Sequence, residues 1–202
     1  MITDIIAWAA VGIILASSTT ILISRDWRIT LGALGVQYLA AFILVIRHLP
    51  LAMGSVKLIT GWMGIAALGM TRLSLTSLED EEEAFWSHGR WFSILLMGIV
   101  TLIAAGSTFR IEAAVPGLGL PVIAGSILLI GAGAAHIGVT TNILRVTVGL
   151  LTLLAGFEIL YAAVESAILV TGLLATVNLG LGILGSYLLI AGSAPLEREE
   201  DL

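Results

Sequence analysis

Two residues of opposite charge stand inside long apolar runs of this sequence. Lys57, the only lysine, lies in GSVKLITGWMGIAALGM, and Glu158 lies in LLAGFEILYAAVE. A charged side chain at the centre of a membrane-spanning helix costs on the order of 3 kcal/mol on insertion scales. Such residues are typically paired, protonated or functional, so Lys57 and Glu158 are the first candidates for chemistry.

Lys57 shares its helical face with glycines. Gly54, Lys57, Gly61 and Gly64 follow one another at intervals of three or four residues. They fall on one side of an α-helix, and a glycine stripe lets a second helix come close. The stripe therefore predicts that Lys57 points into a helix–helix interface. The alternative is a lysine that snorkels to the outer membrane boundary, about two turns away.

The last apolar run carries a second stripe of small and polar residues on one face. Its members are Thr171, Ala175, Asn178, Gly182 and Ser186. Asn178 is expected near the middle of the membrane, where a hydrogen bond between helices is its usual role. The glycines Gly54, Gly61, Gly64 and Gly182 are the predicted helix-packing positions.

Lys57 and Glu158 are expected at the same depth. Lys57 lies seven residues after Pro50 and Glu158 lies seven residues before Glu165, so each is about 10 Å from the same end of its helix. A buried ion pair would offset the desolvation of both charges. Alternatively, snorkelling or protonation serves each residue separately. Asn178 and His136 complete the candidates for an ion pathway. His136 is near the inner end of its apolar run and is expected to touch only the membrane–water interface.

The composition is that of an integral membrane protein. Hydrophobic residues make up 58% of the 202 residues and charged residues 11%, with a mean hydropathy of +1.09, whereas soluble domains are about 25% charged. The chain has no cysteine, and its histidines, His48, His88 and His136, are scattered. No metal or other cofactor is therefore expected. The acidic runs EDEEE (79–83) and EREED (197–201) argue against a nucleic-acid partner.

Seven apolar segments are long enough to cross a bilayer, which needs roughly 20 residues per helix. They are 5–23, 29–46, 50–71, 91–108, 119–139, 143–163 and 167–191. The sequence thus predicts one all-α transmembrane domain over 1–202, with an acidic loop at 72–90 and an acidic tail at 192–202. The first segment lacks the basic start of a secretory signal and is expected to be a retained helix.

Arginines predict the orientation of the chain. With seven spans, one side receives Arg25, Arg28, Arg72, Arg90, Arg145 and Arg198, and the other receives Arg47 and Arg110. Because basic residues accumulate in cytoplasmic loops, the N-terminus is expected outside and the C-terminus, with the loop 72–90, in the cytoplasm.

Two segments carry a resemblance to a known family. TTNILRVTVGLLTLLAGFEILY and the following GLLATVNLGLGILGSYLL, within the helix pair 143–191, resemble subunit K of complex I and the C subunits of multisubunit sodium/proton antiporters. The chain also resembles hydrogenase-4 component E over most of its length. The motifs that carry this resemblance are WRITLG (27–32), Gln37 and SVKLIT (55–60). The resemblance implies a seven-helix subunit in the membrane arm of an ion-translocating redox complex of the cytoplasmic membrane, beside a larger antiporter-like subunit.

The titratable groups depart from the family pattern. The two membrane carboxylates of subunit K would fall near Leu151 and near Val177 or Asn178, and neither position is acidic here. The lysine that follows the Ile-Thr pair in component E is replaced by Gly61, with Lys57 one turn earlier. Glu158 lies two turns from Leu151 on the same face, so it could substitute for a family carboxylate by position.

Two functions therefore stay open. The chain is expected to be a subunit that takes part in ion translocation, or else a structural subunit of a respiratory or photosynthetic membrane complex. No P-loop, HExxH motif or Ser/His/Asp order is present in the sequence, so no catalytic residue and no enzymatic activity of its own are predicted.

Overall fold

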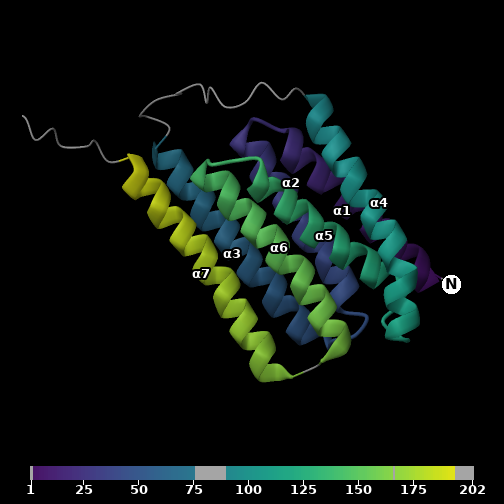
Figure 1. The fold of residues 1–202 in the computed structure, drawn as a ribbon. Helices are drawn as coiled ribbons and strands as arrows, with labels where there is room; N and C mark the ends of the chain where they lie inside the picture. Colours follow the sequence, from purple (N-terminus) through teal and green to yellow (C-terminus); the bar gives the residue numbers. More distant parts are fainter. Residues whose placement is uncertain (1, 76–89, 166, 194–202) are drawn as a thin grey trace, which may run out of the picture.

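The computed structural model describes residues 2–75, 90–165 and 167–193, and these form seven α-helices (Figure 1). The helices are α1 (Ile2–Ile23), α2 (Trp27–Val45), α3 (Leu51–Leu75), α4 (Arg90–Ala114), α5 (Leu120–Gly138), α6 (Ile143–Val164) and α7 (Ile168–Ser193). Each is long and apolar enough to cross a membrane. The predicted all-α class with seven spans is confirmed, and the chain is a multi-pass membrane protein.

The helices form two layers. In one layer α2 packs between α1 and α3; in the other, α4, α5, α6 and α7 follow one another. Across the layers, α1 contacts α4 and α5, α2 contacts α5 and α6, and α3 packs extensively against α7. Figure 1 shows α4 and α7 at opposite edges of this bundle. The central helices α2, α5 and α6 are the most deeply enclosed, so polar residues in the middle of these helices, such as Gln37 and Glu158, meet other helices.

Several sequence-predicted boundaries were wrong at their ends. Helix α4 continues past 108 to Ala114, because the first helix-breaking residue of TFRIEAAVPGLGLP is Pro116. In the predicted loop 72–90, residues 72–75 continue α3 and Arg90 begins α4, and 76–89 lies outside the described residues. The predicted tail 192–202 begins inside α7, which ends at Ser193, and 194–202 is likewise outside the described residues.

Local capping fixes where the helices begin. The Asp26 side chain accepts a hydrogen bond from the backbone N–H of Arg28 and starts α2, and Asn142 does the same for Arg145 and starts α6, as expected for N-cap residues. Before α5, Gly117 and Gly119 have positive φ angles of 99° and 85°, a conformation that glycine adopts readily. Both of their N–H groups donate to the Glu112 carboxylate, which ties this turn to the end of α4.

The most extensive helix contact is between α5 and α6, and its glycines were not among the predicted packing positions. A Cβ atom placed on Gly133 would lie 2.6 Å from the backbone nitrogen of Leu153, and one on Gly156 would lie 2.7 Å from the carbonyl oxygen of Ser126. Only glycine allows the two backbones to come this close. This contact fixes the position of α6, and with it Glu158, against α5 within the second layer.

Candidate functional site: a buried ion pair and its polar neighbours

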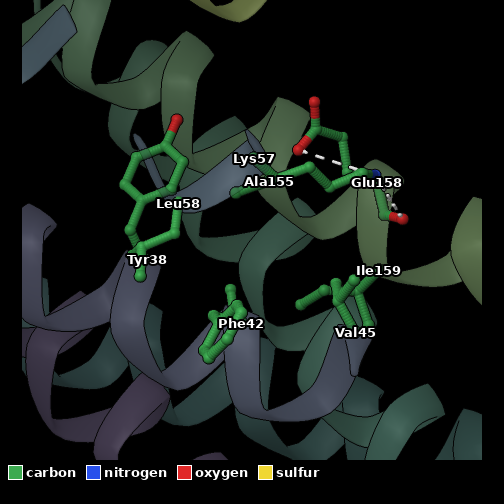
Figure 2. Close-up of a pocket in the computed structure, with 9 residues that line it drawn as sticks. Tyr38, Phe42, Val45, Lys57, Leu58, Ala155, Glu158 and Ile159 are labelled. Atoms are coloured by element: carbon green, nitrogen blue, oxygen red, sulfur yellow. Dashed lines mark hydrogen bonds and ion pairs between the residues drawn. The ribbon is translucent and has the colours of Figure 1, made fainter. Parts of the chain in front are cut away.

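Lys57 and Glu158 meet inside the bundle, as the depth argument predicted. The Lys57 Nζ atom lies 3.8 Å from Oε2 of Glu158, and it donates a hydrogen bond to the backbone carbonyl oxygen of the same residue at 3.3 Å (Figure 2). The two side chains are only 5% and 4% exposed. Lys57 does not snorkel: it crosses from α3 to α6 and holds both the side chain and the main chain of Glu158.

The glycine stripe on α3 gives Lys57 this direction. The buried residues of α3 are Gly54, Lys57, Gly61, Gly64 and Leu68, so the predicted face is confirmed. A Cβ on Gly54 would meet the side chains of Ile46 and Phe42, and the Tyr38 ring occupies the place of a Cβ at Gly61. Helices α2 and α3 are therefore close enough for Lys57 to lie beneath α2 and reach α6.

The stripe on α7 also faces inward. Thr171, Ala175, Asn178, Gly182 and Ser186 are all buried. A Cβ on Gly182 would lie 2.6 Å from the Cα of Gly64, so the two predicted packing glycines of α3 and α7 face each other. Together they bring Asn178 to the side of α2.

Asn178 bonds to a residue that the sequence argument did not single out. The Tyr38 hydroxyl donates a 2.6 Å hydrogen bond to Oδ1 of Asn178. Both side chains are buried, with 3% and 1% of their surface exposed. The hydrogen bond confirms the role expected for Asn178. A buried tyrosine needs a partner for its hydroxyl, which is the signal that could have pointed to Tyr38.

Tyr38 connects this hydrogen bond with the ion pair. Tyr38, Lys57 and Glu158 line the same small cavity, together with apolar side chains of α2, α3 and α6 (Figure 2). Its volume is about 10 Å³, which is about the space that one water molecule needs. Among the described residues, no group bonds to Oε1 of Glu158 or to Nδ2 of Asn178. The site thus combines an ion pair with unused hydrogen-bonding capacity.

A second polar cluster lies next to Tyr38 on α2. Gln37 donates from Nε2 to the Ser18 hydroxyl at 2.8 Å and accepts from the Thr152 hydroxyl at 3.2 Å. Gln37 is 1% exposed, and its amide joins α1, α2 and α6. The sequence argument used Gln37 only for the family resemblance, although an amide within an apolar helix is itself a sign of a buried hydrogen bond.

His136 does not join the ion pair. It lies in the last turn of α5, at the end of the span as expected, and is buried against α6 with 3% of its surface exposed. Its ring carbon Cδ2 lies next to Gly149, and Gly149 is about 13 Å along α6 from Glu158. Neither ring nitrogen has a hydrogen-bond partner among the described residues.

The described part of the chain contains no group of three histidine, aspartate or glutamate side chains placed to hold a metal ion. Chemically, the site offers a charge pair, a phenol and an amide among buried, mostly apolar side chains. Such a site can exchange or relay a proton or stabilise helix packing.

The chain matches no family model, and no curated protein and no solved structure is similar enough to it to count as a match.

Proposed function

We propose that this chain is a membrane-arm subunit of a multisubunit ion-translocating redox complex of the hydrogenase-4 or complex I type. In this proposal it lies in the cytoplasmic membrane beside a larger antiporter-like subunit. The observation that supports it is the buried contact between Lys57 and Glu158. Ionisable residues inside a membrane protein are rare and often mark ion or proton paths, and this pair sits beside a water-sized cavity.

In this function the Lys57–Glu158 pair responds to changes of charge in a neighbouring subunit. When a proton or a charge arrives nearby, the balance between the paired and separated states of Lys57 and Glu158 shifts. Tyr38 and Asn178 supply a hydroxyl and an amide next to the pair. The sequence resemblance to component E and subunit K supplies the class of complex.

A structural subunit is the second candidate, and a specific observation favours it. Leu151, where the resemblance would place a carboxylate, is fully buried among apolar side chains. Over the turns of α6 between Gly149 and Glu158 the chain carries no titratable residue. A proton path through α6 toward His136 would therefore have to cross about 13 Å of this helix without a titratable side chain.

Purification under mild detergent tests the class of complex. An affinity-tagged chain isolated from its native membrane is expected to bring a large antiporter-like subunit with it in stoichiometric amount. A chain that purifies with pigment- or haem-binding subunits instead would support the structural role in a respiratory or photosynthetic complex. A chain that purifies alone would contradict both candidates.

Ion translocation tests the role of the pair within that complex. The double variant Lys57→Met/Glu158→Leu removes both charges together, so no buried charge is left unpaired. In inverted membrane vesicles the assembled complex with this variant is expected to lose most of its ion gradient while retaining its electron transfer. An unchanged gradient in the assembled complex would show that the pair only stabilises the fold.

A further inference from the structure

A groove opens on the outer face of the first layer, between α2 and α3. Its lining comes from the first turns of α2 and from the second half of α3: Trp27, Arg28, Leu31, Gly32, Gly35, Trp62, Ile65, Ala66 and Gly69. Its volume is about 470 Å³, within the roughly 300–1,000 Å³ of small-molecule sites.

Two of the three glycines of this groove, Gly32 and Gly35, leave open space beside α2. A Cβ atom on either would meet no atom of the described residues within 4 Å. This contrasts with Gly61, where the Tyr38 ring takes the place of the Cβ. Glycine in a helix interior is destabilising by roughly 0.5–1 kcal/mol relative to alanine. The groove is therefore hollow although larger side chains would fit the fold.

The two ends of the groove differ in chemistry. At the deep end, the Trp62 ring crosses from α3 and its Nε1–H donates to the carbonyl oxygen of Gly35 at 3.2 Å. At the mouth, the Arg28 guanidinium lies over the Trp27 ring, 5.3 Å from its centre, and Arg28 is exposed. From Trp27 to Gly35 the groove descends about 12 Å into the membrane. The groove therefore leads from the Arg28 guanidinium, at headgroup level, to an apolar deep end between α2 and α3.

We propose that this groove binds a phospholipid, with one acyl chain lying over Gly32 and Gly35 and the phosphate at Arg28. A groove at this depth is filled by hydrocarbon in a bilayer, and its walls are almost entirely apolar. Guanidinium groups bind phosphate oxygens in bidentate fashion. The stacking of Arg28 on Trp27 holds the charge at the mouth, where a lipid phosphate of that leaflet lies. Anionic lipids carry an additional charge and bind more tightly.

Native mass spectrometry of the full chain tests this site. The protein is reconstituted in vesicles of phosphatidylcholine and phosphatidylglycerol, extracted in mild detergent, and its retained lipids are counted. The wild-type chain is expected to retain one phosphatidylglycerol that Gly32→Leu loses, because the new side chain fills the groove. Arg28→Gln is expected to weaken retention about fivefold.

Matched controls separate the groove from general lipid contact. Gly98, on the exposed face of α4, also has nothing within 4 Å of an added Cβ, so Gly98→Leu is expected to retain the lipid. Arg110→Gln removes an exposed arginine from α4 and is expected to have no effect. Equal retention by Gly32→Leu and the wild type overturns the proposal. So does a Gly32→Leu variant that keeps its lipid but loses a second copy or another subunit, because the groove would then be a protein interface.

Discussion

The Nζ atom of Lys57 contacts two oxygens of Glu158, the carboxylate Oε2 at 3.8 Å and the backbone carbonyl at 3.3 Å. The pair joins α3 in one layer to α6 in the other. A distance of 3.8 Å is at the long end for an ion pair, and the carbonyl satisfies a second ammonium proton. The attraction thus offsets part of the desolvation of both groups, and each becomes unfavourable without the other.

Removing one member of the pair is expected to destabilise the protein more than removing both. Lys57→Met leaves the Glu158 carboxylate buried and alone, and Glu158→Leu leaves the ammonium group alone; each is expected to cost about 3–5 kcal/mol. The double variant is expected to cost less than either. Unfolding of purified protein in detergent measures all three.

The exposed pair of Arg47 and Asp4 serves as the control. Its nitrogen–oxygen distance is 2.9 Å, but the side chains are 29% and 56% exposed, so Arg47→Met is expected to cost under about 1 kcal/mol. If the costs of Lys57→Met and Glu158→Leu simply add in the double variant, the two residues are not coupled.

Tyr38→Phe is expected to weaken the contact between α2 and α7. The substitution removes the hydroxyl that donates to Asn178 and leaves a buried amide without that partner. The expected loss is about 1–2 kcal/mol, measured as unfolding free energy in detergent. In the double variant Tyr38→Phe/Asn178→Leu the loss is expected to shrink, because the amide is gone as well. A Tyr38→Phe protein as stable as the wild type would mean that the hydrogen bond contributes nothing.

Gln37→Leu is expected to loosen α1 from α6. Gln37 is the shared partner of the Ser18 and Thr152 hydroxyls, and the apolar side chain cannot replace either bond. Hydrogen exchange should show faster exchange in α1 than in the wild type. The matched change Val36→Leu alters an exposed neighbour on the same helix and is expected to leave exchange unchanged. Equal exchange in the two variants would contradict the role of Gln37.

The sequence predicts most of the fold because hydrophobic length and glycine spacing depend on local geometry. The inward faces of α3 and α7 follow from residues three and four positions apart, and the structure confirms both. The end of α4 could not be placed by hydropathy, because a helix can continue beyond the membrane until a residue such as Pro116 stops it. The close approach of α5 and α6 at Gly133 and at Gly156 could not be predicted without knowing which helices are neighbours.

The site was only partly predictable for the same reason. The contact between Lys57 and Glu158 could be predicted from their equal depth, since depth can be counted along each helix. The order of helices around the bundle cannot be counted in this way. Tyr38 was missed because a tyrosine in an apolar run is equally suited to a lipid-facing position, and only the position of α2 between α3 and α6 shows which way it points.

Cysteine labelling is expected to place the N-terminus outside the cell and the C-terminus in the cytoplasm. Ala114 and Thr141 are exposed and flank the two ends of α5, and the chain has no native cysteine. Ala114→Cys should react with an impermeant maleimide added to intact cells, and Thr141→Cys only after lysis, because arginines accumulate on the Thr141 side. The opposite pattern would invert the topology, and labelling of both from outside would contradict a spanning α5.

Gly182→Ala is expected to separate α7 from α3, although alanine is the better helix former. The new methyl group would lie 2.6 Å from the Cα of Gly64, and a backbone atom cannot move away as a flexible side chain can. The expected cost is about 1–3 kcal/mol or more, measured by unfolding in detergent. Gly180→Ala is the control on the same helix, because its added Cβ would meet nothing within 4 Å. That variant is expected to be neutral or more stable by up to about 1 kcal/mol. Opposite signs for two glycines two residues apart would show that the contact with Gly64, and not helix propensity, determines the packing of α7. Similar effects of the two substitutions would mean that α7 does not approach α3 at Gly182.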